Sequence, residues 1–169
     1  MATTAIEIRR LEAPDAPVFR EIRLEALRLA PEAFSSSFEA ECTQPIDWFA
    51  NRLGKSITFG AFRGAQLVGT AGLVLSDRQK EAHKGTLVGM YVCPDARRTG
   101  VGRRLVETIL EAAKDRLEQV QLAVVSNNTS ALRLYERLGF VQYGLERRAL
   151  KLADRYFDEI RMAKDLVTP

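Results

Sequence analysis

The sequence is poor in the side chains that hold metals or form disulfide scaffolds. Its 169 residues include 2 cysteines (Cys42 and Cys93) and 1 histidine (His83). A structural zinc site needs about four such ligands at set spacings, so we expect no metal. Two cysteines far apart in the chain are typical of a reduced protein and exclude a disulfide-stapled fold.

Long apolar runs are missing as well. Glu7, Arg9 and Arg10 interrupt the N-terminal stretch, which excludes the basic-then-apolar order of a signal peptide. No segment approaches the ~18 apolar residues needed to cross a bilayer. We therefore expect a cytoplasmic protein with no membrane partner. The net charge is only +3, from 25 Lys and Arg against 22 Asp and Glu, which is too balanced to require a nucleic-acid partner.

What the chain does contain is a globular composition, with 46% hydrophobic and 28% charged residues. It shows no internal repeat, low-complexity tract or linker. Because ~100–200 residues per domain is the usual range, we expect residues 1–169 to form a single domain.

The hydrophobic pattern of the N-terminal part predicts a strand and then helices. The period of two at residues 5–11 indicates a half-buried strand. A helix is expected to begin near Pro14 and end at Pro31, with a polar face that includes Arg23. Its expected apolar stripe consists of Val18, Ile22, Ala26 and Leu29. Residues 35–37 read as a short loop, and residues 46–53 as a second helix.

The remainder alternates between strands and helices. An antiparallel hairpin is expected at residues 57–63 and 66–75, turning at Gly64 and Ala65, and another strand at 86–92. A long amphipathic helix follows Gly102, a buried strand covers 120–125, and a helix covers about 128–138. Two strands, near 141–149 and 156–164, complete the chain. This order predicts an α/β fold with a mixed central sheet of about seven strands flanked by about four helices.

An arginine- and glycine-rich turn separates the strand at 86–92 from the long helix. A helix start offers unpaired N–H groups and a positive dipole end, which together bind anions. Glycines let a phosphate approach the backbone, and arginines supply forked donors. The alternative is an ordinary helix entry on a solvated basic face. The turn consists of Arg97, Arg98, Thr99, Gly100, Val101, Gly102, Arg103 and Arg104.

Two other phosphate motifs fail on these residues. Gly64 and Gly69 have the glycine spacing of a P-loop, but Thr70 stands where that motif requires lysine. A dinucleotide fingerprint would need a third glycine where Leu105 stands.

The segment Arg97-Arg98-Thr99-Gly100-Val101-Gly102 instead resembles the acyl-CoA signature Q/R-x-x-G-x-G/A of the GNAT acetyltransferases. About 30 residues later, the segment from Asn128 to Phe140 resembles that family's N-x-x-A-x-x-L-Y-x-x-x-G-F pattern. The two motifs occur in the family's order, each on the expected type of element. The resemblance implies a GNAT-type fold over nearly the whole chain, with its fourth and fifth strands parallel and splayed apart.

The resemblance also implies a role for acetyl-CoA as the acetyl donor. The strand backbone at Met90, Tyr91 and Val92 would face its pantetheine arm and polarise the thioester carbonyl. The turn from Arg97 through Arg98, Thr99, Gly100, Val101 and Gly102 to Arg103 would hold its pyrophosphate. Asn128 would hydrogen-bond the pantetheine arm, although asparagine at this position is also a good helix N-cap.

The same resemblance makes Tyr135 the candidate general acid. A phenol near the sulfur can donate a proton or hydrogen bond as the C–S bond breaks. The alternative is a packed aromatic. Leu134 and Leu138, four residues apart, are expected to form the buried stripe of this helix, which would place Tyr135 towards the edge of that stripe, next to a cleft.

The general base is left open by the sequence. Some relatives carry a glutamate on the fourth strand, but residues 86–92 contain no carboxylate. The candidates are Glu39, Glu41, His83, Glu159 and a chain of water molecules. Cys93, directly before a proline, reads as a space-filling residue, so no covalent acyl-enzyme is expected.

The predicted function is therefore an acetyl-CoA-dependent N-acetyltransferase that acts on an amine of a small molecule or peptide by direct transfer. One alternative is a catalytically inactive CoA-binding regulatory module. A nucleic-acid binder that uses the arginines is weaker, because the aromatic residues expected between them are missing. The resemblance leaves a homodimer open.

Overall fold

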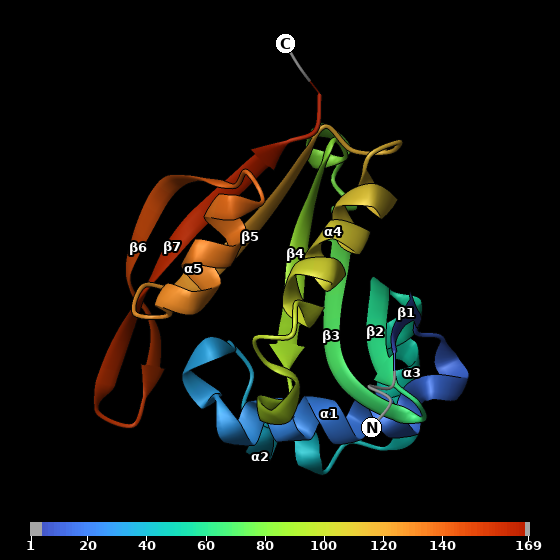
Figure 1. Cartoon of the computed structure of the whole chain (residues 1–169). Helices are drawn as coiled ribbons and strands as arrows, with labels where there is room; N and C mark the ends of the chain where they lie inside the picture. Colours follow the sequence, from blue (N-terminus) through green and yellow to red (C-terminus); the bar gives the residue numbers. More distant parts are fainter. Residues whose placement is uncertain (1–4, 168–169) are drawn as a thin grey trace.

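Seven strands form one sheet within residues 5–167, the part of the chain that the computed structural model describes (Figure 1). The strands are β1 (Ile6–Arg10), β2 (Ile57–Arg63), β3 (Gln66–Leu75), β4 (Lys84–Val92), β5 (Gln119–Val125), β6 (Val141–Leu152) and β7 (Arg155–Asp165). Their order is β1-β2-β3-β4-β5-β7-β6, and only the β4/β5 pair is parallel. This confirms the predicted mixed sheet, its strand number and its parallel fourth and fifth strands.

The helices connect these strands and confirm most of the pattern read from the sequence. They are α1 (Ala16–Leu29), α2 (Phe38–Cys42), α3 (Ile46–Gly54), α4 (Val101–Ala113) and α5 (Thr129–Arg137). Helix α2 was not expected. It forms because Ser37 caps it, with Oγ accepting a hydrogen bond from the Ala40 amide at 3.2 Å. Helix α4 begins one residue before Gly102, since Gly100 is its N-cap.

The predicted stripe of α1 is wrong at its C-terminal end. Leu29 is 54% exposed, whereas Arg23, expected on the outer face, is only 7% exposed. Phe19 and Leu27 are buried instead. The reason is tertiary, because Arg23 finds a buried carboxylate partner on α2.

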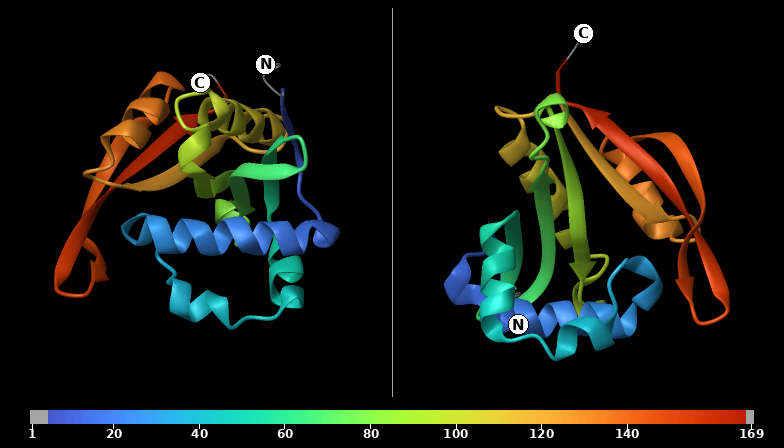
Figure 2. Two further views of the ribbon diagram at one scale, coloured as in Figure 1. Left: turned by 60° about the horizontal axis from the view of Figure 1, so that its bottom comes forward. Right: turned by 180° about the vertical axis from the view of Figure 1, so that it is seen from behind.

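The helices cover the two faces of the sheet. Helices α4 and α5 lie in front of the sheet in Figure 1, while α3 lies behind it, and α1 runs across the lower end of the strands (Figures 1 and 2). A core of Leu105, Ile109, Leu122 and Met162 fills the α4/α5 side. A second core, which includes Phe49, fills the α1/α3 side.

The feature that positions the site is the short contact between β4 and β5. Only Lys84, Gly85 and Thr86 of β4 pair with β5, at Gln119–Gln121. Beyond Thr86 the two strands diverge, and Figure 1 shows the resulting V, which opens towards α1. Strand β5 remains paired with β7 along its whole length, and β4 remains paired with β3. The sheet is therefore two halves joined at one end.

None of the helices within residues 5–167 combines the length and the hydropathy that spanning a bilayer requires. Residues 1–4, which contributed to the expectation about a signal peptide, lie outside the described residues.

The join between the halves depends on a glycine. A Cβ at Gly85 would lie 2.6 Å from Leu117 Cδ1 and 2.9 Å from Leu73 Cδ1, and both leucines are buried. We expect Gly85→Ala to lower the free energy of unfolding by about 1–3 kcal/mol, the usual result of overpacking. Urea unfolding measures this. Gly54→Ala is the matched control, because nothing lies within 4 Å of its Cβ, and an equal loss in both variants would contradict the explanation.

Candidate functional site

The unpaired edge of β4 forms one wall of the candidate site. From Leu87 to Val92 this strand has no β5 partner, so its backbone groups on that side lack a strand to pair with. Of these groups, the Val92 carbonyl accepts a hydrogen bond from Arg97 Nε. A bulge interrupts the same stretch. Thr70 faces Tyr91 and Gly72 faces Val88, so β4 carries one extra residue, and Gly89 adopts φ +60°. The hydroxyl of Thr70 donates to the Gly89 carbonyl at 3.1 Å and holds the bulge in place.

The turn after β4 leads into the N-terminus of α4 at the open end of the V. Gly100 has φ +86°, a left-handed conformation that suits glycine, and the Arg104 amide donates to its carbonyl at 3.1 Å. The amides of Val101, Gly102 and Arg103 therefore have no acceptor within the helix. Helix α4 is long enough for these amides to form an anion site together with its dipole.

Gly102 keeps this helix start accessible. A Cβ there would lie 3.2 Å from Met90 Cε and 3.6 Å from Leu134 Cδ2. Strand β4, α4 and α5 thus meet closely at this residue. The sequence placed the glycine pair and Met90 in one site, and the structure brings them together.

The arginines of the turn do different things. Arg97 Nε donates to the Val92 carbonyl at 3.0 Å, and Arg103 pairs with Glu107 at 2.7 Å. Arg98 is exposed and adopts φ +61°, which costs energy for any residue other than glycine. Arg104 reaches away to the carbonyl of Ile6. Arg97, Arg98 and Arg103 remain beside the free amides.

The other two residues of the turn stabilise it internally. Thr99 Oγ1 donates to the Ala96 carbonyl at 2.6 Å, and Val101 is buried in the core on the α4 side. Their side chains therefore support the turn.

Asn128 is the N-cap of α5. Its Oδ1 accepts a hydrogen bond from the Ala131 amide at 3.1 Å. The alternative reading of this residue as a cap is therefore confirmed. Since the cap uses only the oxygen, the side-chain Nδ2 is still available as a donor.

Tyr135 is the most buried residue of α5, which reverses the expected stripe. It is 5% exposed, and its ring meets Phe140 edge-on at 5.7 Å, while Leu134 and Leu138 are only partly buried. Burial raises the pKa of Tyr135, so the phenol stays protonated at neutral pH. Among residues 5–167 its hydroxyl has no hydrogen-bond partner, and it can therefore still donate to a ligand.

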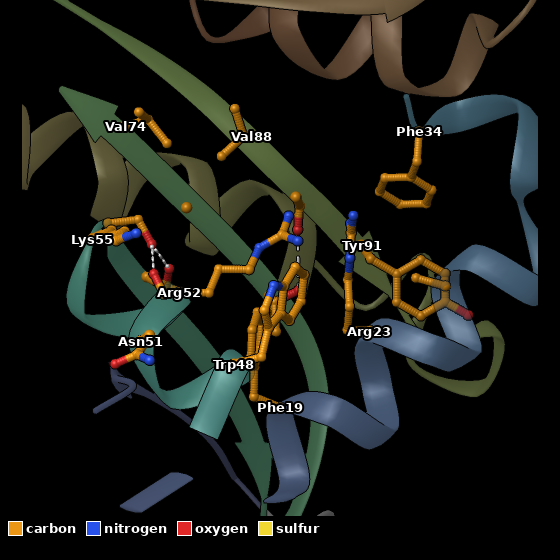
Figure 3. Close-up of a pocket in the computed structure, with 16 residues that line it drawn as sticks. Phe19, Arg23, Phe34, Trp48, Asn51, Arg52, Lys55, Val74, Val88 and Tyr91 are labelled. Atoms are coloured by element: carbon orange, nitrogen blue, oxygen red, sulfur yellow. Dashed lines mark hydrogen bonds between the residues drawn. The ribbon is translucent and has the colours of Figure 1, made fainter. Parts of the chain in front are cut away.

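A pocket of about 440 Å³ lies on the opposite face of β3 and β4, against α1 and α3 (Figure 3). The unpaired part of β4 contributes Val88, Gly89 and Tyr91, so the pocket adjoins the gap in the sheet. The other lining residues are Phe19, Arg23, Ala26, Phe34, Trp48, Asn51, Arg52, Lys55, Ser56, Thr58, Thr70, Gly72 and Val74.

The sequence did not identify the side-chain contacts of Tyr91. Its hydroxyl donates to Glu25 on α1 at 2.9 Å, and burial together with this contact raises its pKa. Burial and the nearby Glu25 also raise the pKa of the Cys93 thiol to about 12. A thiol with this pKa is protonated and a poor nucleophile, which agrees with the expectation of no acyl-enzyme.

Beneath the pocket, Glu41 joins two arginines. It accepts hydrogen bonds from Arg23 at 2.8 and 2.9 Å and from Arg52 at 3.0 Å, and it is 2% exposed. Burial alone would raise the pKa of Glu41. The hydrogen bonds and charge of Arg23, with that of Arg52, outweigh burial and lower it. Glu41 lies on α2, and because its pKa is lowered its carboxylate is a weaker base than a free one.

The remaining candidate bases lie in different places. His83 precedes β4 at the closed end of the V, about 30 Å along the strand from the turn. Glu39 is exposed on α2. Glu159 is opposite Val125, the last residue of β5, and its Oε2 lies 3.6 Å from an Arg161 nitrogen. Glu159 therefore lies level with the end of β5, at the open end of the gap.

The ion pairs of Glu41 make a stability prediction. Replacing Glu41 by Gln leaves two arginines without their carboxylate, so we expect the free energy of unfolding at pH 7 to fall by about 3 kcal/mol. Glu39→Gln, on the exposed side of the same helix, should change it by less than about 0.5 kcal/mol. Chemical unfolding of both variants measures the difference.

The pH dependence gives a second readout for the same pair of variants. The folded-state pKa of Glu41 is lowered, so its stabilisation is present above the ordinary carboxyl pKa of about 4.3 and is lost as pH falls through the folded value. The difference in the free energy of unfolding between the parent protein and Glu41→Gln should therefore disappear at acid pH. A difference in the free energy of unfolding that does not depend on pH would show that charge pairing is not its cause.

Comparison with known proteins agrees with this geometry. Residues 19–140 match the model of the acetyltransferase (GNAT) family. The ribosomal protein bS18-alanine N-acetyltransferase of Salmonella typhimurium is 35% identical over 81 residues, which are 47% of this chain and 55% of that protein. The chain thus spans about half the length of this curated relative.

Solved structures share the fold over nearly the whole chain. A GNAT-family acetyltransferase from Streptococcus pneumoniae has a TM-score of 0.86 at 23% identity, with 96% of this chain and 100% of that chain covered. The yncA protein of Salmonella typhimurium, solved with its cofactor acetyl-CoA, has a TM-score of 0.80 at 18% identity, with 98% and 96% covered.

Proposed function

The chain belongs to the acetyltransferase (GNAT) family, and from this premise we propose that it moves an acetyl group from acetyl-CoA to an amine of a small molecule or peptide. The observation that carries the proposal is the unpaired edge of β4. This edge adjoins the free amides of α4 at one end and the pocket on the other face. A donor and an acceptor can therefore meet there from opposite sides of the sheet.

The residues around the gap suit a CoA thioester, which would supply an activated acetyl group. The amides of Val101, Gly102 and Arg103, with Arg97 and Arg98 beside them, suit the diphosphate. The backbone of Met90, Tyr91 and Val92 can bond the amides of the pantetheine arm and polarise the carbonyl. Asn128 has Nδ2 free for the same arm. Thr99 and Gly100 keep the turn in shape.

In the proposed reaction the amine nitrogen forms a bond to the acetyl carbon, and the bond from that carbon to sulfur breaks. Tyr135 donates a hydrogen bond or proton to the leaving sulfur. The proton lost by the amine passes to Glu159 or through water to bulk solvent. Support for Glu159 comes from its position opposite the last residue of β5.

Tyr135→Phe tests the general acid. We expect kcat to fall by about 10²-fold, because only the phenol donor is removed, while the affinity for acetyl-CoA changes little. Thiol release at saturating amine measures kcat, and titration calorimetry measures the affinity. Tyr143→Phe, an exposed tyrosine on β6, is the control. An unchanged kcat in Tyr135→Phe would exclude this residue as the acid.

Gly102→Asp tests the diphosphate site. The substitution adds bulk 3.2 Å from Met90 Cε and a negative charge beside the free amides. Since like charges at close range cost several kcal/mol, we expect the Kd for CoA to rise by at least about tenfold. Gly102→Ala adds the bulk without the charge and should have the smaller effect. Equal affinities in parent and Gly102→Asp would refute the assignment.

A CoA-binding module without turnover is the second candidate. The same calorimetry separates the two functions when it is combined with thiol release across a panel of amines. Binding of acetyl-CoA with no thiol release for any amine would favour the module over the enzyme.

A further inference from the structure

The pocket on the α1/α3 face has an excess of positive charge. Arg23, Arg52 and Lys55 line it, and none of its lining residues within the described part of the chain is acidic. The nearest carboxylate in this network is Glu41, which is almost fully buried behind the arginines and is not part of the lining. Three cations therefore line the pocket, while Glu41 and Glu25, the two carboxylates that contact its lining residues, lie outside the lining.

The hydrogen bonds leave several donors free. Glu41 takes up Nε and Nη2 of Arg23 and Nη1 of Arg52. Within residues 5–167, the structure contains no acceptor for Nη1 of Arg23, for Nε and Nη2 of Arg52, or for Nζ of Lys55. These donors belong to three residues on the wall of one pocket (Figure 3).

The surroundings make the uncompensated charge costly. Trp48 lies against Arg52, whose guanidinium carbon is 5.3 Å from the ring centroid, and Phe34 lies against Arg23 at 5.0 Å. Burial and the charge of Arg23 lower the pKa of Arg52, although Glu41 acts in the opposite direction. Bound anions relieve repulsion between cations of this kind, and a guanidinium fork matches a carboxylate.

We propose that this pocket binds an acceptor amine that carries an oxyanion, with a carboxylate, as in a free amino acid, preferred to a phosphonate. The inference rests on the proposed function and names its substrate class. Arg52 and Lys55 hold the oxyanion, while Phe19, Phe34 and Val88 contact the apolar part of the acceptor. The amine lies towards Gly89, at the unpaired edge of β4.

Matched substrates test the proposal. Free amino acids with apolar side chains are compared with their carboxamides, with the corresponding aminophosphonic acids and with short peptides, using acetyl-CoA and thiol release. We expect kcat/KM for the acid to exceed that for its amide by about 10-fold to 100-fold, the usual range for a hydrogen bond to a charged group. The comparison with the aminophosphonic acids shows whether the pocket prefers a carboxylate or a phosphonate.

Variants assign the preference to the pocket. Lys55 makes no ion pair within the described residues, so Lys55→Met removes a charge without breaking an ion pair. It should lower the acid-to-amide ratio of kcat/KM by about tenfold, mainly through KM for the acid. Arg52→Lys should lower the ratio as well, since the fork is lost. Lys80→Met, an exposed lysine outside the pocket, should leave the ratio unchanged.

Direct binding keeps the inference separate from turnover. Calorimetry with an N-acetyl amino acid in the presence of CoA should give a Kd that rises in Lys55→Met and not in Lys80→Met. Amines acetylated without regard to a carboxylate, or peptides preferred to free amino acids, would overturn this inference and leave the proposed function intact. If no amine led to thiol release, the proposed function would be overturned. If N-acetyl amino acids also failed to bind, the inference about the pocket would be overturned together with it.

Discussion

The backbone pairing between the two halves of this sheet is limited to three residue pairs. Because β4 and β5 are registered only between Lys84–Thr86 and Gln119–Gln121, the strands can separate towards their C-terminal ends without losing their other neighbours. The separation leaves the edge of β4 that faces β5 without a strand partner in the stretch that contains the bulge at Gly89. A complete ladder would satisfy those groups and close the gap, so the site exists only because this ladder is short. The closed end is correspondingly well packed, with Gly85 admitting two leucine side chains.

Positive charge accumulates on both sides of this gap, by different means. At the turn before α4 it comes from free backbone amides, the helix dipole and exposed arginines around Gly100. In the pocket it comes from Arg23 on α1, Arg52 on α3 and Lys55 directly after α3, and Glu41 from α2 partly neutralises it. The first arrangement suits a diphosphate and the second suits a single oxyanion beside an amine. Strand β4 carries no acidic residue, so the proposed reaction assigns proton removal to Glu159 or to water.

Local sequence patterns were sufficient to predict those elements whose conformation is decided by residues close together in the chain. The hairpin at Ile57–Arg63 and Gln66–Leu75 was predicted to the residue, because alternation and a Gly-Ala turn specify it. The turn before α4 and the helix cap at Asn128 could likewise be predicted from the sequence, since both depend on neighbouring residues in the chain. The errors concern side chains whose environment comes from distant elements. Arg23 is buried because of Glu41, and Tyr135 is buried by Phe140 and the sheet, neither of which periodicity alone can place.

The sequence by itself determined the order and type of nearly all elements, the glycine-rich turn before α4 and the family to which its two motifs point. The tertiary structure alone decided how far β4 and β5 stay paired, which side chains line the pocket and which charges remain without a partner. The reason is that backbone conformation follows from local propensity and periodicity. Register, burial and charge compensation depend on residues that are far apart in the chain and adjacent only after folding.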